Sequence, residues 1–340
     1  MNDVSPPTYE LASKVTSAAR TPSGPDVLVL FEHPEWQKPL FAALEKKGVR
    51  FDTFDLKNAA FVAGDAPAAP VVFNQASPSA YVRGNARAVP LALSYMRALE
   101  AAGSVVLNGH RAFALELSKA AQAALLGRLG LRTPRSIAFN DLDALRAQLA
   151  KEKAWRWPAL LKPEQGGSGA RIVKLGSYDE VRAHVESTRG IWEPDGVLLL
   201  QEYFEHDHER GIVRMEFLGG ELLYAMRVVS HGRYNLCPSE MCNPESGDGI
   251  CEIPAPTEAK PVEFYSFKEV PAEAVAAGKR IVDAGGIDVG GIEYLESHGE
   301  RVFYDVNANS NLRAPIAREH GFDPFERVAD WLAARARAAR

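Results

Sequence analysis

The segment 291–307 constrains the fold most, because its residues have the pattern of two strands joined by a short turn. Side chains alternate between the two faces of a strand. The even-numbered positions are apolar: Ile292, Tyr294, Val302, Tyr304 and Val306. The odd-numbered positions include Glu293, Asp305 and Asn307. The sequence therefore predicts a hairpin with one apolar face and one acidic face, in which Glu293 lies directly opposite Asp305.

Two carboxylates opposed across a strand pair repel each other, and a cation bound between them removes that repulsion. Mg²⁺ takes oxygen ligands and uses one or two carboxylates together with substrate phosphates. An asparagine carbonyl can complete such a set, so Glu293, Asp305 and Asn307 are candidate metal ligands. The alternative is a surface hairpin whose acids are solvated, since exposed Asp and Glu are common.

A second candidate site follows the expected strand 158–162, which ends in Lys162 and runs into a glycine-rich turn. This turn contains Gly166, Gly167, Ser168 and Gly169. Glycine lets backbone N–H groups approach an anion closely, and the lysine adds a positive charge. No Gly-Lys-Ser/Thr follows, so the turn is not a P-loop. The next expected element is a strand, 171–175, which favours a flap over phosphates; an ordinary glycine-rich β-turn is the alternative.

A third signal is an apolar strand, 197–204, that runs into an acidic loop. The end of this strand could hold a purine by its backbone edge, with Glu209 beside the ribose; a buried strand and its exit loop explain the pattern equally well. Three arginines also lie in or beside apolar stretches: Arg214, Arg227 and Arg313. A charge in such a place needs a partner, which is either a bound anion or an internal ion pair.

The order of elements at the N-terminal end indicates a parallel sheet. A strand at 26–31, a helix at 39–47 and a strand at 50–55 form a β-α-β unit, and a strand at 71–73 and a helix at 90–102 follow. The first turn has no Gly-x-Gly, so the dinucleotide fingerprint is absent. Residues 1–25, rich in Pro, Ser, Thr and Ala, are expected to be a disordered tail.

The rest of the chain is expected to form a compact β-α-β-β-α-β unit at 132–204, followed by further strands and helices. Asn140 and Ser177 are the expected caps of the two helices in this unit. The other predicted elements are a single helix at 112–129, strands at 211–217 and 221–229, a helix at 271–284 and a closing helix from about 324.

Bulk properties narrow the function. The net charge of −5 gives no broad basic surface for nucleic acid. No apolar run approaches the roughly 18 residues of a membrane span, and no secretory signal is evident, so a cytoplasmic protein is expected. The three cysteines lie in one loop with a histidine: His231, Cys237, Cys242 and Cys251. These side chains could bind Zn²⁺, although we favour a loop that forms part of a substrate site.

These pieces, in this order, resemble the ATP-grasp superfamily, and most closely its branch of ribosomal-protein glutamate ligases and glutathione-synthetase-like enzymes. The resemblance covers residues 26–318. It implies an α/β (α+β) ATP-grasp fold with an N-terminal Rossmann-like pre-ATP-grasp domain at 26–107 and an ATP-grasp domain at 108–340. The β-α-β-β-α-β unit would be the lid subdomain.

The resemblance also implies roles for individual residues. Ser118-Lys119 is similar to an Asp-Lys step in which the acid is lost, and an acid is likewise missing before Arg214, near Ile212. The implied nucleotide ligands are Lys119, Lys162, Gly166, Gly167, Ser168, Gly169, Gln201, Glu202, Tyr203, Phe204, Glu209 and Arg214. The implied metal ligands are Glu293, Asp305 and Asn307, and the implied catalytic residues are Arg227 and Arg313.

The activity that the resemblance implies is ATP-dependent joining of a carboxylate to an amine through an acyl phosphate. It implies ATP and one or two Mg²⁺ ions, with Mn²⁺ as a substitute. A small-molecule kinase and a non-catalytic nucleotide-binding protein are the alternatives. We expect small-molecule substrates, without nucleic acid or membrane, and a homodimer.

Overall fold

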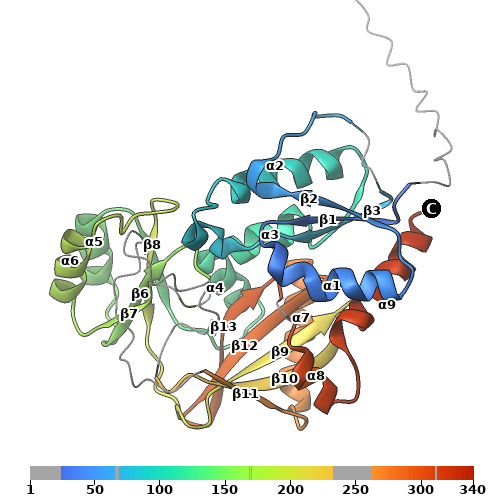
Figure 1. The fold of residues 1–340 in the computed structure, drawn as a ribbon. Helices are drawn as coiled ribbons and strands as arrows, with labels where there is room; N and C mark the ends of the chain where they lie inside the picture. The colour runs from blue at the N-terminus through green and yellow to red at the C-terminus, as the bar shows by residue number, and fades with distance from the viewer. Residues whose placement is uncertain (1–23, 66–68, 168, 170, 233–261, 311) are drawn as a thin grey trace, which may run out of the picture.

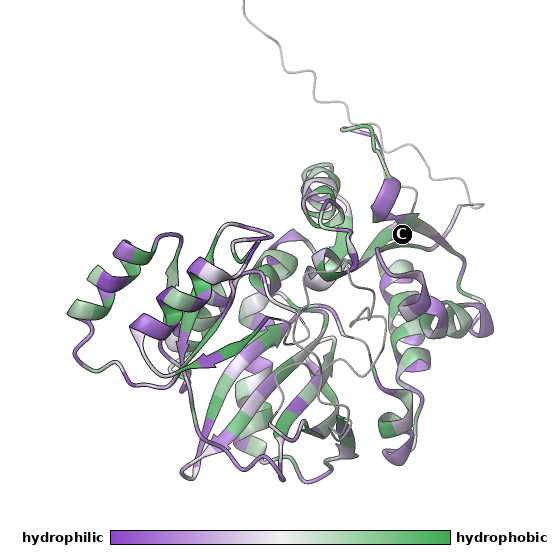
Figure 2. Cartoon of the chain, turned by 60° about the vertical axis from the view of Figure 1, so that its left-hand side comes forward, coloured by the Kyte–Doolittle hydropathy of each residue, from purple (hydrophilic) through white to green (hydrophobic). Residues whose placement is uncertain are grey.

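The computed structural model describes residues 24–340 except 66–68, 168, 170, 233–261 and 311. In that part of the chain, three β-sheets are arranged around the centre of the molecule, and helices cover their outer faces (Figure 1). Hydrophobic residues follow the strands, whereas the outer helices alternate between apolar and polar residues (Figure 2). Most of the predicted tail, residues 1–23, lies outside the described part.

The N-terminal sheet is parallel, as predicted, with the order β2-β1-β3-β4. Its elements are β1 (Val27–Phe31), α1 (Pro34–Lys46), β2 (Phe51–Asp55), η1 (Leu56–Asn58), β3 (Val71–Gln75), η2 (Pro78–Arg83), α2 (Ala88–Ala101) and β4 (Val105–Leu107). β1 and β3 are buried along their whole length, as expected for central parallel strands. The chain leaves β1 towards opposite sides to form β2 and β3, so the carboxyl ends of β1 and β3 border a crevice in which ligands of open α/β sheets bind.

Helix α1 begins five residues earlier than the predicted residue 39. His33 is its N-cap, and the ring nitrogen Nδ1 accepts a hydrogen bond from Trp36 N at 3.4 Å. Pro34 occupies the first turn, where its missing N–H would have no helical partner. The pattern of apolar residues alone did not indicate this start.

The predicted helix 112–129 is two helices, α3 (His110–Leu117) and α4 (Lys119–Arg128). Ser118 breaks it by adopting an extended conformation with φ −122° and ψ 107°. Its hydroxyl accepts a hydrogen bond from Ala121 N at 3.0 Å. A serine that caps the following turn competes with helix continuation, and the apolar periodicity does not reveal such a break.

The middle sheet is antiparallel, with the order β5-β8-β6-β7. Its elements follow the predicted order: β5 (Ser136–Phe139), α5 (Leu142–Lys151), β6 (Ala159–Pro163), β7 (Val173–Leu175), α6 (Tyr178–Ser187) and β8 (Leu198–Glu202). The cap of α5 is Asp141 rather than the predicted Asn140, because the Asp141 carboxylate accepts from Ala144 N at 2.8 Å. The predicted cap Ser177 is confirmed: it accepts from Glu180 N at 3.2 Å.

The C-terminal sheet has the order β11-β10-β9-β12-β13. Its elements are β9 (Ile212–Leu218), β10 (Glu221–Val229), β11 (Glu263–Ser266), α7 (Ala272–Gly285), β12 (Val289–Ser297), β13 (Glu300–Asn307), α8 (Ala314–Glu319) and α9 (Pro324–Ala338). The sequence did not indicate β11 or α8. Helix α7 covers one face of this sheet, where its side chains share a core with β9 and β12.

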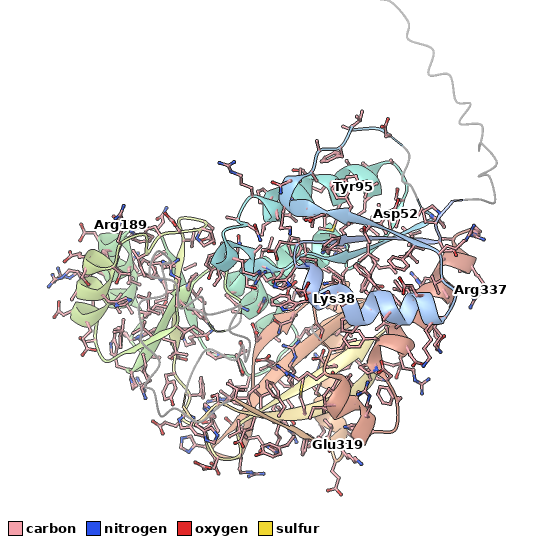
Figure 3. The ribbon with its side chains drawn as sticks, in the orientation of Figure 1. Lys38, Asp52, Tyr95, Arg189, Glu319 and Arg337 are labelled. Atoms are coloured by element: carbon pink, nitrogen blue, oxygen red, sulfur yellow. The ribbon has the colours of Figure 1, made fainter. Side chains whose placement is uncertain are left out.

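Side chains from the N-terminal and C-terminal sheets form one continuous core. Helices α1 and α9 lie side by side over it (Figure 1), and Lys47 at the end of α1 makes an ion pair of 2.8 Å with Asp330 of α9. Arg337 lies on α9, at one side of the molecule, and Arg189 lies just after α6, at the other side (Figure 3). No described helix is long and apolar enough to cross a membrane.

Asn108, which follows the edge strand β4, joins the N-terminal sheet to the C-terminal sheet. It is completely buried and has a left-handed φ of 49°. Its amide nitrogen donates to Val289 O at 2.7 Å and to Ala308 O, and its amide oxygen accepts from Asp288 N at 2.9 Å and Val289 N at 3.0 Å. This side chain therefore fixes the end of β4 to the start of β12 and to the chain after β13.

Candidate active site

The hairpin β12–β13 has the predicted register, with Glu293 opposite Asp305 and Asn307 opposite Gly291. On its other side β12 pairs with β9, which places Arg214 next to Glu293. Glu293 is buried, whereas Asp305 and Asn307 are partly exposed. The three predicted metal-ligand residues thus lie close together on one face of the C-terminal sheet.

One part of the predicted hairpin is wrong: Val302 and Tyr304 do not lie on the apolar face with Tyr294, and Val302 packs with Leu295 in the other core. A bulge shifts the register so that Tyr294 pairs with Phe303, and an extra residue in one strand turns the neighbouring side chain. Phe303 and Tyr294 pack in the core under α7. Tyr304 instead reaches the acidic face, where its hydroxyl donates to Glu293 Oε2 at 2.9 Å.

The two acids of this face have opposite pKa shifts. Burial, reinforced by the nearby negative charge of Asp305, raises the pKa of Glu293. Burial also opposes ionisation of Asp305, but the positive charge and hydrogen bond of Lys119 outweigh it and hold the pKa of Asp305 below its usual value. A cation bound near both carboxylates would favour their charged forms.

These groups fit a Mg²⁺ ion by their chemistry. All three can offer oxygen, and two carboxylates are the number that Mg²⁺ uses beside phosphate oxygens and water. Asn307 donates from Nδ2 to Asp305 Oδ2 at 3.1 Å and to Gly291 O at 3.3 Å, so its carbonyl oxygen remains available as a ligand. Within the described ranges, no three His, Cys, Asp or Glu side chains gather as a metal cluster, so oxygen atoms from a ligand would complete the coordination.

Two predicted lysines converge on the same region from different elements. Lys119 is the first residue of α4 and makes an ion pair with Asp305. Lys162 lies in β6 and donates to Gln201 Oε1 of β8 at 2.7 Å. Burial, with a further contribution from Lys119, lowers the pKa of Lys162 to about 8. Both lysines are buried, so they present positive charge where water is largely excluded.

The glycine-rich turn after β6 lies against the N-terminal sheet as well as α4. A Cβ atom on Gly167 would be 2.7 Å from Cβ of Ser79, and one on Gly166 would be 3.4 Å from Cε of Lys119. Gly169 has a left-handed φ of 71°, which glycine adopts without strain. The fourth predicted residue of this turn, Ser168, lies outside the described residues.

The predicted purine segment connects the middle sheet to the C-terminal sheet. Glu202 ends β8, and its backbone N–H donates to Arg135 O at 2.9 Å. Lys174 lies over the Tyr203 ring at 4.3 Å, and Arg132 lies over the Phe204 ring at 5.3 Å. Glu209 is exposed in the following loop, where its N–H donates to Asp207; its carboxylate has no contact with the acidic face among the described residues.

Arg214 is held by two acids and a serine. It donates to Glu216 Oε1 at 2.6 Å, to Glu293 Oε1 at 2.8 Å and to Ser310 Oγ at 3.3 Å. Burial alone would lower its pKa, but the two carboxylates outweigh burial and raise it. Glu216, Ser310 and Tyr304 were not recognised from the sequence. Glu216 follows Arg214 at the alternating spacing of a strand face, and this signal could have indicated it.

Arg227 does not join the site. Its neighbour Met226 pairs with Arg214, so alternation along β10 directs Arg227 to the opposite face of the sheet. There it lies over the Phe267 ring at 4.4 Å and 3.7 Å from Glu296. The prediction that Arg227 faces the phosphates is therefore wrong, since an internal ion pair accounts for its charge.

Arg313 lies on the face that carries Arg214, at the start of α8. Its backbone N–H donates to Tyr224 Oη at 2.7 Å, and its guanidinium lies 3.3 Å from the centre of the Phe264 ring. Burial, with a further contribution from Arg214, lowers the pKa of Arg313 to about 10. Among the described residues, no carboxylate pairs with this guanidinium, so it can bind an anion.

Glu116, at the end of α3, is a further buried acid that the sequence did not single out. Burial raises its pKa to about 8, and its Oε2 has no hydrogen-bond partner among the described residues. The cysteines of the predicted zinc group, Cys237, Cys242 and Cys251, lie outside the described residues. The fourth member, His231, is bound to Glu263 at 2.8 Å.

The sequence matches no family model and no curated protein. Solved structures that are similar to this one include those of three proteins. The ATP-grasp ligase PsnB, complexed with minimal precursor, Mg and ADP, is 19% identical, with a TM-score of 0.60 over 92% of this chain and 97% of that one. An ATP-grasp RimK domain protein from Sphaerobacter thermophilus is 16% identical, with a TM-score of 0.63 over 90% and 98%.

D-cycloserine synthetase DcsG is 15% identical, with a TM-score of 0.65 over 91% of this chain and 99% of that one. The likeness extends over nearly the whole length of each neighbour, and it includes all three sheets. At these identities it establishes the architecture, and the prediction of fold class is confirmed: the chain has the ATP-grasp fold.

Proposed function

We propose that this protein is a Mg-ATP-dependent ligase that joins a carboxylate to an amine and releases ADP and phosphate. The observation that supports it most is the convergence of Lys119, Lys162 and the pair Glu293–Asp305 from four elements: α4, β6, β12 and β13. The positive charges of two buried lysines suit the phosphates of a nucleotide. The opposed acids suit the Mg²⁺ ion that accompanies those phosphates. PsnB, which has the same fold, was solved with Mg and ADP.

In this proposal the nucleotide lies between the middle and C-terminal sheets. Lys119 and Lys162 bind its phosphates, the glycine-rich turn covers them, and the segment 201–204 borders the purine. Glu293, Asp305 and Asn307 hold one or two Mg²⁺ ions, which neutralise phosphate charge. Arg214 and Tyr304 keep Glu293 in position, because each donates to one of its oxygens.

The chemistry follows in two steps. A carboxylate oxygen of the substrate attacks the γ-phosphorus of ATP, the bond to ADP breaks, and an acyl phosphate forms. The amine nitrogen then attacks the acyl carbon, the bond to phosphate breaks, and the nitrogen loses a proton to solvent. Positioning and charge neutralisation supply most of the catalysis in such transfers. We assign Arg313 to the transferring phosphoryl group or to the oxyanion, because its guanidinium has no carboxylate partner among the described residues.

The carboxylate and amine would bind where the carboxyl ends of β1 and β3 face the glycine-rich turn. Ser79, in η2 just after β3, packs against Gly167, and Gln165 donates to Pro78 O at 3.1 Å. Closure of this contact would exclude water, which otherwise hydrolyses an acyl phosphate. We propose small-molecule substrates. Turnover with a peptide instead, such as the precursor peptide in a complex of PsnB, would replace this proposal.

The test is turnover of Mg-ATP with pooled small carboxylates and amines, with ADP, AMP and phosphate measured separately. Release of ADP and phosphate that depends on the amine, and that Glu293→Gln abolishes, supports the ligase. Glu296→Gln is the matched control, since Glu296 lies on the same strand but pairs with Arg227 on the other face. ADP without free phosphate would indicate a kinase instead, AMP would reject an acyl phosphate, and nucleotide binding without turnover would indicate a non-catalytic protein.

A further inference from the structure

The first turn of α4 contains no acidic residue, although its N–H groups and helix dipole attract negative charge. The carboxylate of Glu164 occupies this position from outside the helix. Ala120 N donates to both its oxygens, at 3.0 and 3.2 Å, and the Ser118 hydroxyl donates to Oε1. Glu164 is 9% exposed, so these are buried, charge-assisted hydrogen bonds.

The backbone of Glu164 connects the same elements. Its carbonyl oxygen accepts from Lys119 N at 3.4 Å and from Gly166 N at 3.1 Å, and its own N–H donates to Val197 O at 3.2 Å. Lys162 lies two residues earlier, in β6. Glu164 therefore fixes the start of α4, which carries Lys119, next to the end of β6, which carries Lys162, and next to the beginning of the glycine-rich turn.

The charge of Glu164 also matters to the lysines. Lys162 is buried, and the positive charge of Lys119 makes its charged form less favourable, whereas the negative charge of Glu164 favours that form. A carboxylate beside them offsets this repulsion, while its contacts with α4 keep it from forming an ion pair with either ammonium. A neutral residue at 164 would remove this negative charge from beside Lys162, and α4 would lose its anchor on β6.

We propose that Glu164 is the positioning residue of the nucleotide site, and that it supplies across space the acid that the Ser118-Lys119 step lacks in sequence. It fixes the N-terminus of α4 on β6, so that Lys119 and Lys162 reach the same phosphates. This inference rests on the proposed function, because it concerns the same nucleotide.

The test compares Glu164→Gln and Glu164→Ala with wild type, by calorimetric titration of Mg-ADP and by thermal unfolding. We expect the dissociation constant of Mg-ADP to rise about tenfold, as is typical when one charged hydrogen-bond group is lost. Adding Ser118→Asp to either variant should restore most of the affinity, since it places a carboxylate at the same helix end. In turnover, KM for ATP should rise more than kcat falls.

Glu180→Gln is the matched control. Glu180 also accepts a hydrogen bond from a backbone N–H beside a helix start, Gly176 N at 2.8 Å, but it lies in α6, away from both lysines. It should leave the affinity for Mg-ADP unchanged. Equal affinity in wild type and the Glu164 variants, or no rescue by Ser118→Asp, would overturn the inference alone. Failure of wild type to bind Mg-ADP would overturn the proposed function with it.

Discussion

Lys119, the first residue of α4, makes an ion pair with Asp305 on β13. This contact ties the helix that carries a candidate phosphate ligand to the strand that carries two candidate metal ligands. It also leaves Glu293, opposite Asp305, without an ammonium of its own, although Arg214 donates to it. Lys119 therefore pairs with one acid and Arg214 with the other, and a bound metal ion would add positive charge between the two.

Lys119→Met should make the stability of the protein depend on Mg²⁺. The variant leaves two acids close together with less positive charge, so it should unfold at a lower temperature than wild type. Mg²⁺ binds only the folded pair and stabilises it by mass action. Thermal unfolding with and without Mg²⁺ should show a larger increase in Tm for the variant than for wild type. An equal increase with Na⁺ at the same ionic strength would contradict a specific site.

Tyr304→Phe should weaken the metal site without unfolding the protein. The hydroxyl holds one oxygen of Glu293, and loss of a group that orients a metal ligand typically lowers activity or metal affinity about 10- to 100-fold. The Mg²⁺ dependence of turnover should shift to higher concentrations. Tyr294→Phe is the control on the same hairpin, because the Tyr294 hydroxyl is buried with no partner among the described residues. That change should be neutral or stabilising.

Nucleotide affinity should fall as the pH rises through about 8. Burial, with a further contribution from Lys119, lowers the pKa of Lys162 to about 8, so free Lys162 is charged below this pH and neutral above it. If the phosphate binds only the charged form, affinity decreases about tenfold per pH unit above 8. Titration of Mg-ADP over about three pH units, from roughly 6.5 to 9.5, measures this change in affinity. Lys162→Arg should flatten the profile, since arginine keeps its charge; a flat wild-type profile would exclude the role of Lys162.

Asn108→Ala should be strongly destabilising. It leaves several buried backbone groups of the 288–289 and 308 segments without partners, and we expect a loss of about 3–5 kcal/mol of unfolding free energy. Asn108→Gly removes the same bonds but tolerates the φ of 49°, so it should be less destabilising by about 1 kcal/mol. Urea unfolding measures both. Asn140→Ala, at an exposed position that caps no helix, should change stability by less than about 0.5 kcal/mol.

Local patterns were sufficient to predict the hairpin, the parallel start of the chain and the β-α-β-β-α-β unit. Each depends on alternation or on apolar runs that a short segment displays by itself. Glu293 and Asp305 do oppose each other as predicted, but the bulge brings them together, because Ser297 pairs with Glu300 and Tyr294 with Phe303 before the register shifts. The parity argument failed for Tyr304 because the bulge adds one residue to β13. Three consecutive apolar residues, Val302, Phe303 and Tyr304, interrupt the alternation there, but they do not show which of them is the extra one.

The sequence by itself determined the strands, most helices and the pair of acids, because these depend on neighbours within a few residues. Only the tertiary structure decided which face of the sheet Arg227 occupies and which carboxylate reaches the start of α4. Glu164 lies 44 residues from Ala120, whose N–H it accepts, and Lys119 lies 186 residues from Asp305. Contacts over such separations depend on how the sheets pack together, and no local pattern of residues encodes that packing.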